Sequence, residues 1–169
     1  MKYFLLFLNL LILPNCFAQK TIKDVLKQFN TLSVPYISVS ELKSQTNVII
    51  LDARETKEFN ISHLKNAQNI GYETFDGSKF KTNFKNQSAT FVVYCSIGVR
   101  SEKIGEKLLK LGYKNVFNLF GGIFEWKNQG EEIVDNQNKT TDKSCVLVFE
   151  IGFKFRTVKL LETNVLCVF

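Results

Sequence analysis

The stretch TFVVYCSIGVRS (residues 90–101) places an apolar run directly before a cysteine. The run from Thr90 to Tyr94 has the length of a buried strand, and an amphipathic helical pattern opens one turn after Cys95. In an open α/β sheet, ligands bind beyond the carboxyl ends of the strands. Loop amides, an arginine and a helix N-terminus all favour a thiolate. The stretch therefore predicts that Cys95 is a nucleophile in an anion-binding loop that ends near Arg100.

Strand-like and helix-like patterns alternate on both sides of this stretch. We expect strands at 36–39, 48–51, 67–70, 90–94 and 115–120, and helices at 21–30, 40–45, 56–61, 101–111 and 122–128, with 73–84 partly helical. Ser40 is of a type that caps helices, and Gly112 is suited to end one. The alternation predicts an α/β fold with an open, mainly parallel five-stranded sheet and helices on both faces.

The N-terminus has the features of a secretory signal. Lys2 precedes an apolar run from Tyr3 to Leu13, and the small residue Ala18 is suited to cleavage. We therefore expect residues 1–18 to be a signal peptide and the protein to be exported, periplasmic or secreted. The alternatives are a buried helix, a membrane anchor through this segment, or lipidation at Cys16.

Composition and charge indicate one ordinary globular domain. The chain has 169 residues, of which 45% are hydrophobic and 22% charged. Its net charge of +6 favours small anionic molecules. Because the lysines are spread between acidic residues, the pattern does not favour nucleic acid as a partner. Of the four cysteines, we expect Cys95 to be free, while Cys145 and Cys167 could form a disulfide or remain two separate thiols.

The C-terminal part differs in composition from the rest. Residues 131–143 are polar and are expected to form a linker. Residues 144–169 are rich in Val, Leu and Phe without a clear helical period. This tail could be two strands packed on the domain, or the product of a reading-frame error near Lys143.

Six short motifs resemble, in order and spacing, those of a single-domain rhodanese. They are Leu51-Asp52-Ala53-Arg54, Glu58-Phe59, Ser62-His63-Leu64, residues 67–70, residues 95–101 and Gly121-Gly122-Ile123-Phe124-Glu125-Trp126. One motif alone would be weak evidence, but six in order are specific. The resemblance implies a rhodanese domain over residues 39–130, preceded by a helix and lead-in at 19–38. The chain departs from the family pattern at Lys65-Asn66 and in its tail.

The resemblance implies a cofactor-free sulfurtransferase in which Cys95 carries a persulfide. The substrate-binding residues would be the loop members Ser96, Ile97, Gly98, Val99, Arg100 and Ser101. Four residues between Cys95 and Arg100 enclose a ring of amides small enough for one sulfur atom, whereas phosphatases with a similar loop carry one more residue. The expected partners are a small anionic donor such as thiosulfate and a thiol, cyanide or protein-thiol acceptor. A non-enzymatic binding module and a cysteine-dependent phosphatase or arsenate reductase are the alternatives.

The other motif residues are expected to support the structure. Asp52, Arg54 and Glu58 are spaced for an ion-pair network at a strand end. His63 is the single histidine and cannot form a metal site alone; the resemblance implies that its ring holds backbone groups. Gly122 would let the last strand turn into its helix, and Trp126 would anchor the core. Arg100 could orient the donor or hold a carboxylate or the loop backbone.

Overall fold

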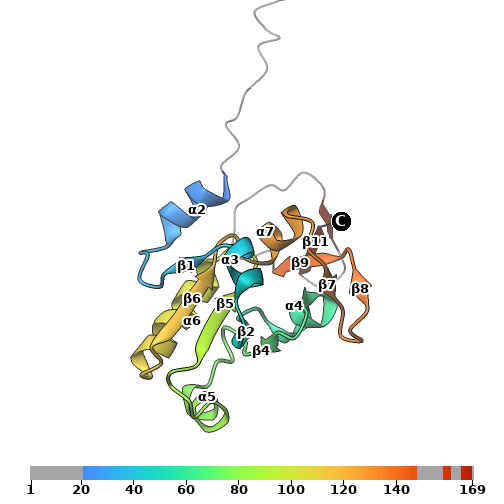
Figure 1. Cartoon of the computed structure of the whole chain (residues 1–169). Coiled ribbons are helices and arrows are strands. Elements are labelled where there is room, and N and C mark those ends of the chain that lie inside the picture. The colour runs from blue at the N-terminus through green and yellow to red at the C-terminus, as the bar shows by residue number, and fades with distance from the viewer. Residues whose placement is uncertain (1–20, 148–157, 161–164, 169) are drawn as a thin grey trace, which may run out of the picture.

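A parallel five-stranded sheet forms the centre of the protein (Figure 1). The computed structural model describes residues 21–147, 158–160 and 165–168, and the side chains of residues 21–143. The strands lie in the order β1-β6-β5-β2-β4, and each neighbouring pair is parallel. Their bounds are β1 (Tyr36–Ile37), β2 (Val48–Asp52), β4 (Gln68–Asn69), β5 (Thr90–Tyr94) and β6 (Asn115–Leu119). This confirms the predicted sheet.

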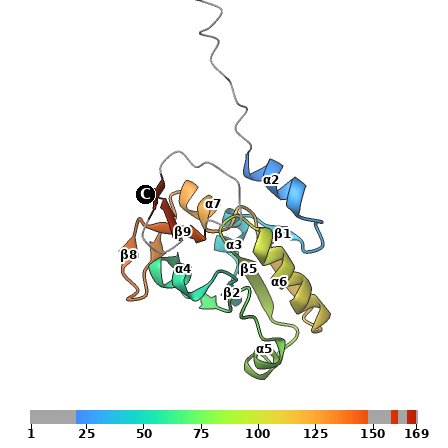
Figure 2. The ribbon, with the colours of Figure 1, turned by 180° about the vertical axis from the view of Figure 1, so that it is seen from behind.

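Helices cover both faces of the sheet, as Figures 1 and 2 show from opposite sides. They are α2 (Ile22–Phe29), α3 (Val39–Ser44), α4 (Thr56–Ile61), α5 (Gly77–Asn83), α6 (Val99–Lys110) and α7 (Gly122–Asn128). Side chains of β5 alternate between two cores: Val92 packs with residues of α2, α3 and α7, whereas Phe91 and Val93 pack with residues of α5 and α6. The two cores fix β5, and with it the loop that follows, from both sides.

The N-cap of helix α3 lies two residues earlier than the sequence predicts. Ser38, not Ser40, is its N-cap: the Ser38 hydroxyl accepts the Glu41 amide at 3.2 Å, and the Glu41 carboxylate accepts the Ser38 amide at 2.7 Å. This reciprocal capping box satisfies two amides that a cap at Ser40 would leave open. It also ends β1 at Ile37 instead of Val39.

Helix α6 also begins two residues early. Its N-cap is Gly98, whose φ of 117° lies in the left-handed region that favours glycine. Ser101, expected to open the helix, lies inside its first turn, and its hydroxyl donates to Asn118 Oδ1 at 2.7 Å. The helix therefore starts directly from the loop that holds Cys95.

Two small antiparallel sheets lie outside the central one. The first joins β3 (His63–Leu64), β7 (Ile133–Val134) and β8 (Thr140–Thr141). It lies partly within residues 131–143, expected as a polar linker, because Ile133 and Val134 form a buried apolar pair. The second joins β9 (Ser144–Leu147), β10 (Val158–Leu160) and β11 (Val165–Val168), three strands where the sequence suggested two.

Several sequence predictions remain untested. Cys145 and Cys167 occupy paired positions of β9 and β11, but a disulfide between them stays a prediction. Residues 1–18, with the expected signal and Cys16, lie outside the described residues. Within the described part of the chain, no helix has the length and apolar character needed to cross a membrane.

Candidate active site

Cys95 directly follows β5 at the carboxyl edge of the sheet. Its side chain is buried, with 1% of its surface exposed. The Gly98 amide donates to Cys95 Sγ at 3.1 Å, and the Ser101 hydroxyl lies 3.5 Å from the same atom. A thiolate gains from the Gly98 amide, because a hydrogen bond to a charged form stabilises it. The proton of the Ser101 hydroxyl is instead donated to Asn118 Oδ1 at 2.7 Å.

The first two carbonyls of the loop are held on its outer side by α7. The Cys95 carbonyl accepts the Ile123 amide at 3.0 Å, and the Ser96 carbonyl accepts the Phe124 amide at 3.2 Å. In a trans peptide the N–H points opposite to the C=O. The amides of Ser96 and Ile97 therefore point into the loop.

The carbonyl of Gly98 is held in the same manner by two asparagine side chains. Asn118 Nδ2 donates to it at 2.8 Å and Asn30 Nδ2 at 2.9 Å. By the same peptide geometry, the Val99 amide faces away from both asparagines and into the loop. The loop is thus a concave ring of amides suited to one small anionic atom next to Cys95 Sγ.

Gly122 makes the approach between α7 and the loop possible. A Cβ at this position would lie 2.2 Å from the Cys95 carbonyl oxygen and 2.7 Å from that of Ser96, and its φ is +54°. Only glycine avoids both the collision and the backbone strain. Gly122 therefore has a second role besides the predicted one in the turn: it allows α7 to contact the reactive loop.

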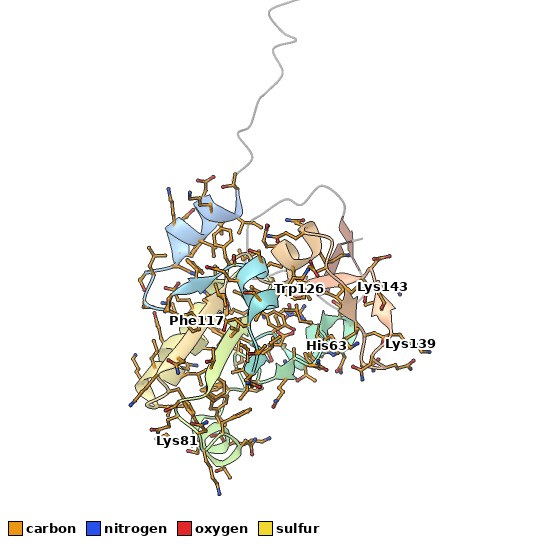
Figure 3. The ribbon with its side chains drawn as sticks, in the orientation of Figure 1. His63, Lys81, Phe117, Trp126, Lys139 and Lys143 are labelled. Carbon is orange, nitrogen blue, oxygen red and sulfur yellow. The ribbon has the colours of Figure 1, made fainter. Side chains whose placement is uncertain are left out.

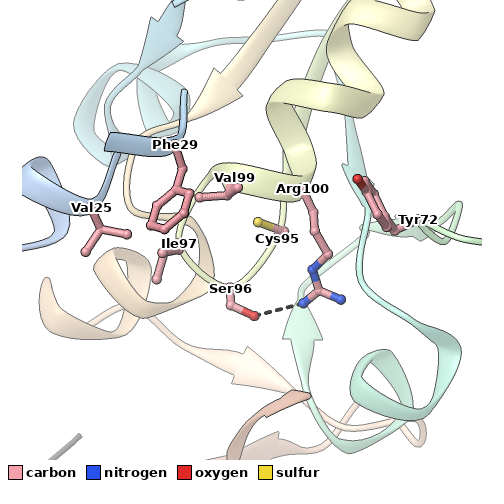
Figure 4. A pocket seen from close by; sticks show the side chains of 8 residues that line it. All are labelled: Val25, Phe29, Tyr72, Cys95, Ser96, Ile97, Val99 and Arg100. Atoms are coloured by element: carbon pink, nitrogen blue, oxygen red, sulfur yellow. Dashed lines mark hydrogen bonds between the residues drawn. The ribbon is translucent and has the colours of Figure 1, made fainter. Parts of the chain in front are cut away.

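Arg100 forms a buried ion pair with Glu58. Its Nη1 donates to Glu58 Oε2 at 2.8 Å and its Nη2 donates to Glu58 Oε1 at 2.9 Å. Nη2 also donates to the Ser96 hydroxyl at 3.1 Å, as drawn in Figure 4. The sequence placed Glu58 with Arg54, one helical turn away, but the structure pairs Glu58 with Arg100. The charge of Arg100 is thus balanced within the protein.

Asp52 and Arg54 form a separate, fully buried pair. Arg54 Nη2 donates to Asp52 Oδ2 and to the Ser62 carbonyl, each at 2.6 Å, and both side chains of the ion pair have no exposed surface. Burial opposes the charged guanidinium, but Asp52, Tyr94 and Glu58 together outweigh it and raise the pKa of Arg54 above its ordinary value. The pair holds the turn after β2 and does not line the Cys95 cavity.

His63 and Trp126 lie away from the loop. The His63 ring stacks on Phe59 with a centroid distance of 3.8 Å, and its Nδ1 donates to the Phe59 carbonyl at 2.9 Å. Trp126, on α7, is partly buried against the core, and its indole N–H donates to the Glu132 carbonyl at 2.9 Å. Figure 3 shows the two side chains on separate elements. Neither residue lines the cavity beside Cys95.

A cavity of about 110 Å³ opens beside Cys95. Figure 4 shows its walls: Val25 and Phe29 of α2 on one side, Tyr72 on the other, and the Cys95 sulfur between them. The full lining is Val25, Phe29, Tyr72, Cys95, Ser96, Ile97, Val99 and Arg100. Most of these side chains are apolar, so the cavity joins an amide ring to a hydrophobic wall.

The sequence did not reveal five contributors to this site: Asn30, Asn118, Val25, Phe29 and Tyr72. Asn118 had a signal, because it is a polar residue between the apolar residues Phe117 and Leu119 of β6. Asn30 and Phe29 had none, because nothing local shows that α2 packs beside a loop some 70 positions later. No group of three or more His, Cys, Asp or Glu in the described part of the chain is arranged to hold a metal ion.

The fold and site together define a class: an α/β protein with a buried cysteine in an amide ring at the carboxyl end of a parallel strand. The sequence profile of the rhodanese-like domain matches residues 38–129, more than half of the chain. The chain belongs to the rhodanese-like family.

Curated relatives include two tRNA uridine(34) hydroxylases. The one from Prochlorococcus marinus is 29% identical over 143 residues, which cover 70% of this chain and 46% of the relative. The one from Photorhabdus laumondii is 28% identical over 97 residues, which cover 56% of this chain and 28% of the relative. The chain thus matches about half or less of the length of these proteins.

Two solved structures share the fold. Thiosulfate sulfurtransferase from Pseudomonas aeruginosa has a TM-score of 0.55 and 19% identity, covering 64% of this chain and 22% of that one. The rhodanese-like domain of an Anabaena protein has a TM-score of 0.56 and 21% identity, covering 76% of this chain and 94% of that one. At these identities the likeness concerns the fold.

Proposed function

We propose that this protein is a sulfurtransferase that carries a sulfane sulfur on Cys95. The observation that carries the proposal is the inward-facing amide ring around Cys95 Sγ, in which the Gly98 amide already donates to the sulfur at 3.1 Å. A persulfide places a second sulfur, with its negative charge, one bond further out. Ring amides stabilise that charge without a metal or an organic cofactor.

The reaction consists of two displacements on the same sulfur atom. The Cys95 thiolate attacks the outer sulfur of a donor such as thiosulfate; the donor's S–S bond breaks, and its electron pair leaves with sulfite. An acceptor thiolate or cyanide then attacks the outer sulfur of the Cys95 persulfide. The new bond forms as the persulfide bond breaks, and Cys95 returns as a thiolate.

Because Glu58 balances the charge of Arg100, we assign Arg100 the role of positioning the loop. Its guanidinium joins Glu58 of α4 to the Ser96 hydroxyl. This bridge holds the loop against α4, and it leaves recognition of the transferred sulfur to the amides. Four residues between Cys95 and Arg100 support sulfur over a larger phosphate as the bound group.

We do not propose a hydroxylase activity on the basis of the two tRNA uridine(34) hydroxylases, because this chain matches about half or less of the length of those proteins. The charged and apolar pattern of residues 1–18 supports an exported sulfurtransferase. In an oxidising compartment, Cys95 would need a reducing partner to remain a thiolate.

Intact-mass measurement after treatment with thiosulfate tests the proposal. We expect the reduced wild-type protein to gain about 32 Da, one sulfur, which cyanide then removes. Cys95→Ser should gain nothing, because it lacks the attacking thiolate. Cys145→Ser, the same change outside the loop, should still gain the sulfur. A protein that is folded and reduced yet takes no sulfur from thiosulfate or an organic persulfide would be a binding module instead.

A further inference from the structure

Helix α2 forms one wall of the cavity although it lies outside the matched family region. The family match begins at residue 38, whereas α2 spans Ile22–Phe29. Val25 and Phe29 of this helix line the cavity together with Ile97 and Val99 (Figure 4). Val25 is buried, but Phe29 keeps 49% of its surface exposed. A half-exposed phenylalanine at the mouth of a reactive site offers apolar surface to a bound molecule.

The end of α2 is fixed by partly buried hydrogen bonds to α6 and to the loop before it. Asn30, which follows Phe29, donates to the Gly98 carbonyl at 2.9 Å. The amide of Thr31 donates to Glu102 Oε1 at 2.7 Å, and Glu102 is fully buried in α6. Phe29 is therefore held at a defined place beside the loop, and the wall is part of the site's architecture.

The opposite wall is Tyr72, whose ring is also held in place. Lys107 Nζ lies 5.6 Å from the centroid of the Tyr72 ring, within the range of a cation–π contact. The cavity between the two aromatic walls has a volume of about 110 Å³. Apolar protein cavities of about 150 Å³ take up benzene. The space is therefore of the order needed for a small ring or a branched alkyl group that is partly exposed at the mouth.

The charge of the cavity favours a donor with one negative charge over a dianion. Among its lining residues, all of them in the described part of the chain, Arg100 is the one cationic side chain, and Glu58 balances it. The attacking Cys95 thiolate adds a negative charge. A dianionic donor such as thiosulfate would bring a second uncompensated charge into this apolar space, whereas an organic donor exchanges that charge for an apolar substituent.

We propose that the preferred sulfur donor is a monoanionic organic sulfane compound with an aromatic or branched apolar substituent, which Phe29 and Tyr72 recognise. This inference rests on the proposed sulfurtransferase function and specifies its substrate class. With a thiosulfonate, RSO₂S⁻, the Cys95 thiolate bonds to the terminal sulfur. The bond between that sulfur and the sulfonyl sulfur breaks, and the electron pair leaves with the sulfinate RSO₂⁻. The persulfide anion keeps the second charge, so atoms and charges balance.

The test compares benzenethiosulfonate with methanethiosulfonate. For each donor, kcat/KM is measured for sulfur transfer to a thiol acceptor. This value is divided by the rate constant for the reaction of the same donor with free cysteine, which corrects for the different intrinsic reactivities of the two donors. In the wild type we expect the corrected kcat/KM to be about tenfold higher for benzenethiosulfonate than for methanethiosulfonate, because the benzene ring is partly buried on binding. Phe29→Ala should lower that ratio to near unity, and Phe29→Leu should give an intermediate value.

Leu32→Ala is the matched control. Leu32 is another exposed apolar side chain, three residues after Phe29, with 66% of its surface exposed, and it does not line the cavity. Its loss should leave the corrected ratio within twofold of wild type.

Three outcomes would count against the proposal, and they differ in meaning. A wild-type ratio near unity, or a Phe29→Ala ratio equal to wild type, would overturn the role of α2 while sulfur transfer itself stands. A kcat/KM for thiosulfate that exceeds the one for benzenethiosulfonate would overturn the preference for a monoanion. Absence of transfer from every donor would instead remove the proposed function.

Discussion

Two neighbouring strands, β2 and β5, are each followed by a turn with a buried arginine. The two turns differ in which backbone groups remain free to bind a ligand. The strands pair in parallel with Asp52 opposite Tyr94, so both turns begin at the same edge of the sheet. After β2, Arg54 is held by Asp52 of its own turn and by a carbonyl, and neither side chain reaches solvent. That turn is closed, because its two charged side chains are satisfied by each other and by backbone groups.

After β5, Arg100 takes its carboxylate from outside its own loop. Glu58 of α4 balances the guanidinium, and α7 and two asparagines take the loop carbonyls. The amides are then left facing Cys95 Sγ. Because each turn has a paired arginine, the arginine does not explain why only one turn is reactive. Reactivity at this edge depends on which backbone groups already have a hydrogen-bond partner.

Gly122→Ala is the most severe way to break the second turn. The added Cβ would collide with the Cys95 carbonyl oxygen at 2.2 Å, at a φ of +54°. We expect a loss of about 4 kcal/mol in the free energy of unfolding, from strain and overpacking together. Sulfur loading of Cys95 should fall with it, because α7 would no longer hold the loop carbonyls. Urea denaturation and intact mass measure the two effects.

Gly130→Ala separates the collision from the backbone strain. Gly130 also has a positive φ, +79°, but a Cβ there would meet nothing within 4 Å. We expect a loss of about 1 kcal/mol from strain alone and normal sulfur loading. Equal losses at the two glycines would mean that contact with the loop has no special weight.

Exchanging the two carboxylates for amides compares the turns directly. Asp52→Asn and Glu58→Gln each remove the carboxylate charge that pairs with a buried arginine, so each should cost about 3 kcal/mol in unfolding free energy. Only Glu58→Gln removes a negative charge next to an arginine that lines the Cys95 cavity. We expect it to lower the KM for thiosulfate about fivefold, because the site then repels the dianion less. Asp52→Asn should leave this KM within twofold of wild type.

The salt dependence of KM is the check on this explanation. An electrostatic gain in the binding of thiosulfate should shrink as ionic strength rises, since salt screens the dianion as it approaches the cavity from solvent. If Glu58→Gln left the KM unchanged at low salt, the balance of Arg100 by Glu58 would not control the entry of anions.

The strands and the reactive loop could be predicted because their signals are local. The apolar run of 90–94 followed by Cys95 specifies a strand end, and four residues to Arg100 specify the loop size. Helix starts were displaced at α3 and α6, where a capping box at Ser38 and a left-handed Gly98 competed with plausible serine caps. Residue type alone could not decide between two serines two positions apart.

Pairings between distant segments could not be predicted. Glu58 lies four positions from Arg54, and its charge stabilises that guanidinium, but its hydrogen-bonded partner is Arg100, 42 positions away. Which arginine it meets depends on how α4 and α6 approach the sheet edge. Phe29 gave no signal either, because its contact with the cavity follows from the hydrogen bonds that fix the end of α2.

Asn118→Ala makes the smallest change to the second turn. It removes the 2.8 Å donor to the Gly98 carbonyl, leaving Asn30 as the other donor, and it removes the 2.7 Å acceptor of the Ser101 hydroxyl. We expect a cost of about 2 kcal/mol in unfolding free energy, because two buried hydrogen bonds are lost. The peptide that carries the Val99 amide would be held less firmly, so the maximal rate of persulfide formation should fall about fivefold with little change in the KM for the donor.

Asn115→Ala is the control on the same strand. Asn115 is exposed and donates to the Ser88 carbonyl, at the end of β6 far from Cys95. Its loss should change neither the unfolding free energy beyond about 0.5 kcal/mol nor the rate of persulfide formation. Asn118→Ala that loses stability but forms the persulfide at the wild-type rate would show that Asn118 only supports β6. A slower maximal rate in a folded Asn118→Ala protein would instead show that persulfide formation depends on the orientation of the peptide group between Gly98 and Val99. That orientation would then be what distinguishes the reactive turn after β5 from the turn after β2.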